Sequence, residues 1–208
     1  MHGTSLISGK CFSETYGGIG KVVVDIGGQD VNGSLRSFFI ERGMKFICID
    51  MIEHPSVDIV VKPGEKMPFD NGSIDLIVST SCFEHDPCFW LTFREMTRII
   101  KSDGFIYINA PTSGPYHCYP GDNWRFYSDA GQALAYWSGI QVSNEDVFPV
   151  KVVETFNILG SGWNDFVCVW KRVENKETDI LVHSDVINNI GILEKSINDN
   201  GLSTRKKC

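Results

Sequence analysis

The stretch Lys21–Gly33, KVVVDIGGQDVNG, decides the predicted fold, and the rest of the chain can be built outward from it. Three consecutive valines starting at Val22 have the β-branched composition of a strand that is buried on both faces. The pair Gly27–Gly28 follows, and because glycine lacks a Cβ atom, the backbone there can approach a ligand closely. Residues 34–42 then have the apolar spacing of a helix. A buried strand that breaks into a glycine turn before a helix predicts a ligand crevice at the carboxyl ends of the strands in an open α/β sheet.

The charge of this turn indicates which ligand it can take. Its glycines match neither the G-x-G-x-x-G nor the G-x-x-x-x-G-K-[ST] pattern of dinucleotide and phosphate sites. The carboxylates of Asp25 and Asp30 would repel a pyrophosphate. S-adenosylmethionine has no phosphate and carries a sulfonium and an ammonium group, so an acidic glycine turn suits it. The alternative is an ordinary strand–helix turn whose glycines serve packing.

The strand, turn and helix resemble the first motif of class I S-adenosylmethionine-dependent methyltransferases, in which a D-x-G-x-G-like turn cradles the methionine end of the cofactor. This resemblance implies that Asp25, Gly27 and Gly28 bind the cofactor. A second strand over 45–49 ends at Asp50. An acidic residue at this place accepts hydrogen bonds from ribose hydroxyls in nucleotide-binding α/β folds, and that geometry serves NAD and S-adenosylmethionine alike. A solvated carboxylate at the strand end is the plainer alternative for Asp50.

The sequence around Met67–Phe69 is similar to a second methyltransferase pattern, in which an acidic residue precedes Leu-Pro-Phe and a Phe-Asp pair opens the next strand. The resemblance implies that Met67 lines the adenine and that Ser79, farther along, lies beside the cofactor. The usual adenine-facing aspartate falls near Pro63, which has no carboxylate. We therefore expect adenine recognition to rest on Glu65, on backbone groups around it, or on Asp58.

The remaining blocks follow the order of the same family. The pattern predicts, in chain order, a helix over 86–101, an exit turn over 101–104, a strand over 105–108, a helix over 129–138, a strand with an irregular excursion over 140–153 and a final hairpin within 154–170. The resemblance covers about residues 20–170. It implies an α/β, Rossmann-like class I methyltransferase fold, with a mostly parallel sheet, an antiparallel last strand and helices on both faces. We place the domain at 21–172, after a loose lead-in over 1–20 and before a polar extension over 173–208. Within the lead-in, a short turn of helix could cover the cofactor.

The apolar run 76–78 predicts the strand before Ser79, and the segment that follows it contains the pair Glu84-His85. The family commonly has such a pair where this loop borders cofactor and substrate. His85 is a candidate general base, because a free imidazole titrates near neutrality. It could equally hold the loop by hydrogen bonding, or lie beside the cofactor without taking part in the chemistry.

The segment 109–127, NAPTSGPYHCYPGDNWRFY, is the most unusual part of the chain. It is too rich in proline and glycine for regular structure, and loops at that sheet edge carry function on α/β scaffolds. Aromatic faces together with carboxylate and guanidinium groups suit a polyol such as a sugar. For removal of a proton from an acceptor hydroxyl, His117 is the first candidate and Asp122 the second. The candidate substrate-binding residues are Tyr116, Tyr119, Trp124 and Arg125.

Two other interpretations of this loop stay open. Its aromatic residues could merely pack the loop onto the sheet, and Arg125 could clamp a phosphate or carboxylate, as in a nucleotide-linked sugar. The loop resembles methyltransferases associated with surface-glycan biosynthesis, which implies a saccharide acceptor. His85, His117 and Asp122 could be assembled into a metal site, but their spacing is not diagnostic, so we expect no metal.

Composition sets the remaining expectations. The chain has 208 residues, enough for one domain with a substantial core. Its formal net charge of -7 argues against a nucleic-acid backbone or an anionic membrane as the main partner. The seven cysteines are scattered and form no C-x-x-C pair, which indicates a reducing compartment. The sequence also has no apolar stretch of spanning length and no signal-peptide pattern. We therefore expect a cytoplasmic location. The sequence is compatible with a homo-oligomer.

The leading prediction is therefore an S-adenosylmethionine-dependent O-methyltransferase that acts on a saccharide or nucleotide-linked sugar in glycan biosynthesis. Three alternatives remain: a methyltransferase for another small molecule through oxygen or nitrogen, a non-catalytic module with the same fold, and a nicotinamide-dependent reductase. The acidic turn and the missing G-x-G-x-x-G pattern disfavour the reductase.

Overall fold

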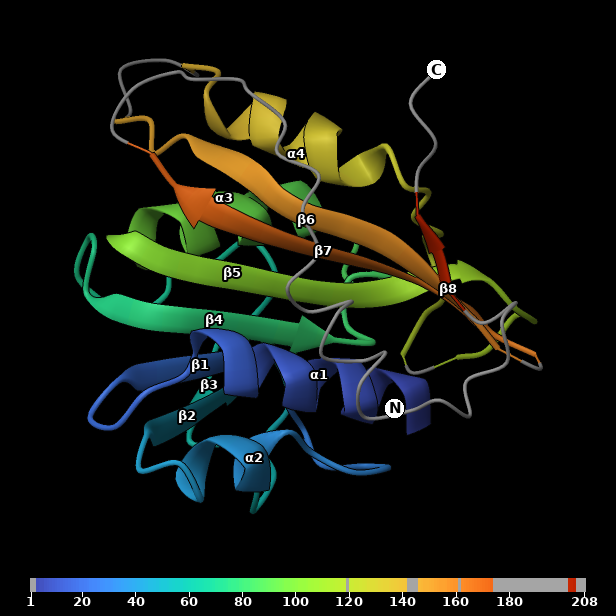
Figure 1. Ribbon diagram of the computed structural model, residues 1–208, viewed down its shortest axis with the longest axis horizontal. Coiled ribbons are helices and arrows are strands. Elements are labelled where there is room, and N and C mark those ends of the chain that lie inside the picture. The colour runs from blue at the N-terminus through green and yellow to red at the C-terminus, as the bar shows by residue number, and fades with distance from the viewer. Residues whose placement is uncertain (1–2, 119, 142–145, 161, 174–201, 205–208) are drawn as a thin grey trace.

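The computed structural model describes residues 3–118, 120–141, 146–160, 162–173 and 202–204, and over these residues the chain folds around one sheet (Figure 1). Its eight strands have the spatial order β3-β2-β1-β4-β5-β7-β6-β8. The strands are β1 (Val22–Ile26), β2 (Lys45–Asp50), β3 (Ile59–Val60), β4 (Ile74–Thr80), β5 (Ile100–Ser113), β6 (Val150–Leu159), β7 (Asn164–Arg172) and β8 (Leu202–Thr204). The helices are α1 (Gly3–Tyr16), α2 (Arg36–Ile40), α3 (Phe89–Ile99) and α4 (Ala130–Ser138).

The direction of the strands follows the predicted pattern. β1 runs parallel to β2 and β4, and β4 runs parallel to β5. β7 lies between β5 and β6 and is antiparallel to both. The chain moves outward from β1 to β3 and then returns to the other side of β1 as β4. The carboxyl ends of β1 and β4 therefore form the switch point at which open α/β sheets bind their ligands.

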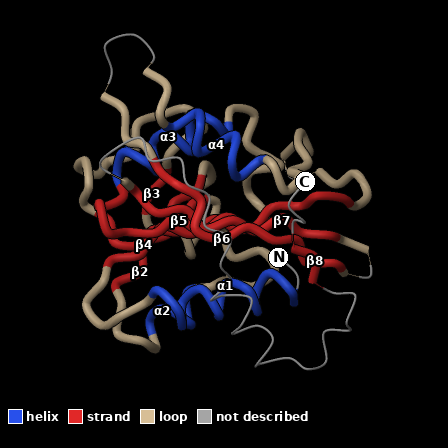
Figure 2. Tube along the Cα trace, turned by 45° about the horizontal axis from the view of Figure 1, so that its top comes forward, coloured by secondary structure: helices blue, strands red, loops and turns tan. Residues whose placement is uncertain are grey.

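Helices cover both faces of the sheet, as predicted. Figure 2 shows α1 and α2 below the sheet and α3 and α4 above it. Alternate residues of β1 face these two layers, since Val23 packs with the α1 and α2 side chains whereas Val24 packs with those of α3 and α4. Both valines are fully buried. Burial on both faces explains why this strand is a continuous apolar run in the sequence.

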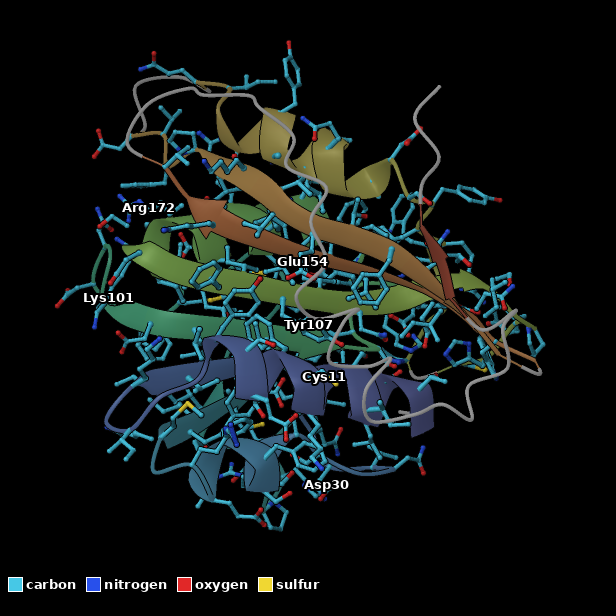
Figure 3. All side chains as sticks on the ribbon, in the orientation of Figure 1. Cys11, Asp30, Lys101, Tyr107, Glu154 and Arg172 are labelled. Carbon is cyan, nitrogen blue, oxygen red and sulfur yellow. The ribbon has the colours of Figure 1, made fainter. Side chains whose placement is uncertain are left out.

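The lead-in expected over residues 1–20 is different in the structure, where α1 packs against the sheet. Phe12 is fully buried in one apolar cluster with Leu35, the residue before α2, and Tyr107 of β5. The hydroxyl groups of Ser8 and Tyr107 lie 2.7 Å apart and share a hydrogen bond. In Figure 3, Cys11 and Tyr107 mark the place where α1 passes over the sheet. The sequence predicted at most a short turn of helix here, because much of the buried face of α1 consists of serines and a glycine, which give no apolar period.

The exit turn expected over 101–104 is also different, because these residues remain in β5 as a bulge. Ile74 pairs with Ile100, whereas Leu76 pairs with Phe105, so several residues of β5 lie opposite Asp75. The Lys101 ammonium group lies 2.6 Å from the Asp75 carboxylate and holds the bulge against β4. Lys-Ser-Asp-Gly has the composition of a turn, and the pairing of the flanking residues Ile100 and Phe105 with β4 keeps it in the sheet.

Three other segments differ from the prediction in extent. The helix expected over 86–101 begins at Phe89, because Asp86 forms a turn in which its Oδ1 accepts a hydrogen bond from the Cys88 amide. Among the described residues of 140–149 no strand forms, and β6 begins at Val150. Of the extension 173–208, the structure describes residue 173 and the strand β8, which pairs antiparallel with β6.

The longest helix in the described residues, α1, has 14 residues. Among the described residues, no helix combines the length and the apolar character needed to cross a membrane.

The packing of α1 gives a testable prediction for stability. We expect Phe12→Ala to lower the free energy of unfolding by about 3 to 5 kcal/mol, because it removes a fully buried ring and leaves a cavity. Urea unfolding of the purified chain measures this loss. Ile19→Ala is the control, because that side chain is 91% exposed and its removal should change stability by less than about 0.5 kcal/mol. A similar small change for Phe12→Ala would mean that α1 is a loose lead-in after all.

Candidate functional site

A cavity of about 500 Å³ lies at the carboxyl ends of the central strands, where the sequence predicts a crevice. Ligand pockets of small molecules and cofactors commonly have volumes of this order. One end of the cavity is walled by the glycine turn after β1, the end of β2 and the segment after β3. The other end is walled by the segment after β4 and by the loop after β5. The cavity therefore connects the predicted cofactor region with the predicted substrate loop.

The turn Gly27–Gly28 is held by close approach of its neighbours. Both of its amide groups donate to the carbonyl oxygen of Ile49, at 2.8 Å and 3.3 Å. Gly27 has a φ of +72°, and a Cβ atom there would lie 2.2 Å from the sulfur of Cys82. A Cβ atom at Gly28 would lie 2.5 Å from Oδ2 of Asp25. Both positions therefore need glycine, and the turn presents backbone rather than side chains to the cavity.

Asp25 lies beneath this turn and does not line the cavity. Its carboxyl group is buried, and Oδ1 has no hydrogen-bond partner. Burial raises the pKa of Asp25 to about 7, and the nearby Asp50 carboxylate adds to the increase. Asp25 thus acts on the cavity as a buried acidic group below the backbone, and not as a direct wall residue.

Asp50 lines the cavity at the end of β2, as expected. Its Oδ2 accepts a hydrogen bond from the Gln29 amide at 3.1 Å, and its Oδ1 accepts one from the Ile52 amide at 3.3 Å. These two bonds fix the carboxylate, while each oxygen keeps a lone pair for a further donor. The geometry suits a carboxylate that accepts hydrogen bonds from ligand hydroxyls.

The segment after β3 supplies another part of this wall. Pro63, Glu65 and Met67 line the cavity, so the position of the usual aspartate faces it as proline. Glu65 accepts a hydrogen bond from the Lys62 amide at 3.0 Å, which closes a tight turn. Asp58 lies away from the cavity lining, because its carboxylate binds Arg36 and the Cys48 amide. Of the three sequence alternatives for adenine recognition, only Glu65 and the backbone around it therefore border the cavity.

The structure corrects the role expected for Ser79. Its side chain is fully buried within β4, and its hydroxyl donates to the Ile26 carbonyl at 2.8 Å. It does not line the cavity. Ser79 therefore holds the end of β1 in place and does not border a cofactor directly. Farther along the cavity wall, Ser81 has a φ of 50°, a left-handed conformation that costs a non-glycine residue free energy.

The other end of the cavity contains Glu84, His85 and His117, which we call the Glu-His-His cluster. One potential ligand atom of each residue lies within 4.8 Å of the others. The His85 and His117 rings meet edge to face with centroids 4.8 Å apart. Glu84 is only 1% exposed, and burial raises its pKa to about 8. Burial, together with the neighbouring His117, lowers the pKa of His85, so its ring is neutral near pH 7.

The loop after β5 reaches this cluster through backbone hydrogen bonds. The amides of Asn123 and Trp124 both donate to the carbonyl oxygen of Glu84, at 2.7 Å and 3.2 Å. The Asn123 side chain also donates to the carbonyl oxygen of His85. These contacts bring His117, which belongs to the same loop, against the pair after β4.

Asp122 has a different role from the proton acceptor expected from the sequence. Its two oxygens are held by the Arg125 guanidinium, with 2.6 Å between Nη2 and Oδ2, and the His117 amide donates to Oδ2 at 3.0 Å. The hydrogen bond from Arg125 holds the pKa of Asp122 well below its usual range. A carboxylate this firmly ionised is a poor base, so Asp122 is a positioning residue beside His117.

The aromatic candidates lie at the rim. Tyr116 is 74% exposed, and Trp124 donates through Nε1 to the Asp86 carbonyl at 2.9 Å while packing against Phe89. Neither they nor Arg125 line the cavity, and the predicted Tyr119 lies outside the described residues.

The aromatic ring that does line the cavity is Trp163, which the sequence analysis missed. Its ring centroid lies 4.8 Å from that of His117, in an edge-to-face arrangement. Trp163 directly follows Gly160-Ser161-Gly162, and a tryptophan placed in a glycine connection was the signal that could have indicated it.

Comparisons with known proteins agree with this geometry. Residues 31–108 match the family described as "Methyltransferase domain". An uncharacterized methyltransferase of Mycobacterium sp. (strain KMS) is 29% identical over 99 residues, which cover 43% of this chain. The matched segment spans 38% of the length of that relative.

Solved structures extend the likeness to most of the chain. The 1,6-didemethyltoxoflavin-N1-methyltransferase of Burkholderia thailandensis, solved with bound 1,6-didemethyltoxoflavin and S-adenosylhomocysteine, is 16% identical; the match covers 82% of this chain and 79% of that one, with a TM-score of 0.62. The YcgJ protein of Bacillus subtilis is 13% identical, with 84% and 100% covered and a TM-score of 0.62. At such identities the likeness shows the fold, and the predicted Rossmann-like class I methyltransferase fold is confirmed.

The buried carboxyl of Asp25 predicts a pH-dependent stability. The folded chain keeps this proton up to about pH 7, whereas the unfolded chain releases it near pH 4, so this group lowers the free energy of unfolding as the pH rises between these values. Asp25→Asn removes the ionisable group and therefore the loss of stability that it causes as the pH rises. We expect the variant to gain stability over the wild type with rising pH, by on the order of a few kcal/mol. Urea unfolding of the cofactor-free chain at several pH values measures it.

The control for this prediction is Asp103→Asn, which changes an exposed carboxylate in the β5 bulge. If the pH profiles of wild type and Asp25→Asn run parallel, Asp25 does not carry the raised pKa.

Proposed function

We propose that this chain is an S-adenosylmethionine-dependent methyltransferase that methylates a hydroxyl group of a saccharide or nucleotide-linked sugar. One observation carries the proposal: a single cavity joins the glycine turn and Asp50 at one end to the Glu-His-His cluster at the other. A methyl donor and an acceptor must meet in one such space, because transfer requires the two reacting atoms to be aligned and in contact.

The first end of the cavity fits the cofactor. The turn Gly27–Gly28 leaves the space that side chains would fill, and Asp50 offers oxygen atoms to ribose hydroxyls. Asp25 lies buried beneath the turn with an unpartnered oxygen, which favours a ligand with cationic groups over one with phosphates. Glu65 and Met67 stand where the adenine would lie. The cofactor supplies a methyl group bound to a sulfonium.

The cofactor assignment also has support from relatives. The match to the methyltransferase domain family covers Asp50, Met67 and the pair Glu84-His85. The Burkholderia thailandensis enzyme, which shares the fold, was solved with S-adenosylhomocysteine. A non-catalytic module is less well supported, because such a module has no need of an acceptor-side cluster open to the same cavity.

The second end of the cavity fits a hydroxylated acceptor. A sugar presents an apolar face that packs on an aromatic ring, and Trp163 offers such a ring beside His117. The loop after β5 resembles those of methyltransferases associated with surface glycans, and this resemblance is the reason for preferring a saccharide. As the new carbon–oxygen bond forms, the hydroxyl must lose its proton. We assign activation of that hydroxyl to Glu84, His85 and His117, with Asp122 and Arg125 as the groups that position His117.

Binding of the cofactor is the first test. We expect calorimetric titration of the purified chain to show binding of S-adenosylhomocysteine and none of NAD(H). Asp50→Ala should weaken the binding of S-adenosylhomocysteine by about 10-fold or more, since hydrogen bonds to a charged group are lost. Asp70→Ala, which changes an exposed carboxylate outside the cavity, is the matched control. Equal affinity in wild type and Asp50→Ala would remove Asp50 from the site.

The acceptor is tested with a labelled methyl donor and a panel of nucleotide sugars and glycan intermediates. Once an acceptor is found, we expect Trp163→Ala to raise its KM by about 10-fold while the affinity for S-adenosylhomocysteine stays unchanged. Trp124→Ala is the comparison, because that ring packs at the rim, and we expect a smaller change. Transfer to nitrogen acceptors alone would replace the saccharide by another small molecule.

A further inference from the structure

The Glu-His-His cluster has the composition and spacing of a metal site. Glu84 and His85 are adjacent after β4, whereas His117 comes from the loop after β5, and their potential ligand atoms lie within 4.8 Å of one another. Bonds from a divalent transition metal to nitrogen or oxygen are about 2.1 Å long, so ligand atoms around one ion lie up to roughly 4 Å apart. Small shifts of these side chains would therefore close the set around a single ion.

Glu84 points to a cation in this place. Its side chain is 1% exposed, and Oε2 has no hydrogen-bond partner. Its Oε1 lies 3.6 Å from Nε2 of His85, beyond hydrogen-bonding distance. A buried carboxylate with an unpartnered oxygen is costly, and the usual compensations are a paired charge or a bound metal.

The two imidazole rings are oriented as metal ligands commonly are. Nδ1 of His85 donates a hydrogen bond to the Gly121 carbonyl, which leaves the lone pair on Nε2. Nδ1 of His117 makes no hydrogen bond but lies 3.2 Å from Oδ2 of Asp122, which can hold its proton and leave Nε2 as the ligand atom. Metal-binding histidines typically place their other ring nitrogen against a backbone carbonyl or a carboxylate in this way.

The surrounding charges favour a cation as well. Three groups act on Glu84 from nearby: the carboxylates of Asp122 and Asp165 and the guanidinium of Arg125. The Arg125 charge is already paired, because both terminal nitrogens of its guanidinium hydrogen-bond to the Asp122 carboxylate. Arg125 is therefore not free to compensate a carboxylate at Glu84, whereas a divalent ion would do so.

We propose that Glu84, His85 and His117 bind a divalent transition-metal ion and leave an open coordination position that faces the cavity. Two imidazoles and one carboxylate suit Zn²⁺, Mn²⁺ or Fe²⁺, whereas Mg²⁺ prefers oxygen ligands alone. The sequence led us to expect no metal, and that expectation concerned the set His85, His117 and Asp122. The structure places Asp122 behind His117 and brings Glu84 into the set instead.

The role of the ion rests on the proposed function. A hydroxyl that coordinates a divalent ion is more acidic and is fixed in position. In the transfer, the hydroxyl proton passes to solvent water and the oxygen forms the new bond to the methyl carbon. The carbon–sulfur bond of the sulfonium breaks to leave a neutral thioether, so no oxidant or reductant is required.

The test is metal binding by the purified, tag-free chain. After removal of metals with a chelator, we expect calorimetry to show a single equivalent of Zn²⁺ bound, and Co²⁺ to give the visible absorption of a site with nitrogen ligands. Glu84→Gln and His117→Gln should each weaken the binding of Zn²⁺ by about 100-fold or more, because each removes a ligand. His54→Gln is the matched control, since this histidine lies outside the cavity and bonds to Ser56.

The outcomes separate this inference from the proposed function. Each preparation is also titrated with S-adenosylhomocysteine, whose binding shows that the chain is folded and tests the cofactor site alone. Zn²⁺ binding that is absent, or that is equally strong in Glu84→Gln, His117→Gln and His54→Gln, overturns the metal site even where S-adenosylhomocysteine binds. Methyl transfer that continues unchanged in the metal-free chain overturns the role of the ion at the acceptor.

Discussion

The close approach of the β1–α2 turn to the strands beside it is the constraint on which the site depends. The amides of Gly27 and Gly28 both donate to the Ile49 carbonyl, so the turn is pinned to the end of β2. Side chains at these positions would overlap Cys82 and Asp25. The turn therefore presents bare backbone to the cavity, and the same pinning sets where the end of β2, with its carboxylate, stands relative to the turn.

Buried carboxylates without full compensation mark both ends of this cavity. Asp25 lies beneath the glycine turn and Glu84 in the Glu-His-His cluster, and each has an oxygen with no hydrogen-bond partner. Burying such groups lowers stability unless a positive ligand is present. The proposed cofactor and the proposed metal ion both bring positive charge. An unpartnered oxygen on a buried carboxyl group thus supports both proposals.

The parts of the fold that could be predicted are those whose residues carry a local pattern. β1 is a valine run, and the helix near Phe93 and Met96 repeats its apolar residues with helical spacing. α1 carries no such pattern, because the residues it buries besides Phe12 are largely small and polar, such as Ser8. The bulge in β5 looks like a turn for a related reason: its composition is that of a turn, and its place in the sheet comes from its partner strand.

The sequence by itself determined the glycine turn, the acidic end of β2 and the succession of strands and helices, because these follow from composition and spacing over a few residues. Only the tertiary structure decided which polar side chains meet. Hydrogen bonds from the loop after β5 to the Glu84 carbonyl place His117 beside Glu84, while Arg125 engages Asp122. Trp163 reaches the cavity from a still more distant connection. Such meetings depend on contacts between segments far apart in the chain, which no local pattern contains.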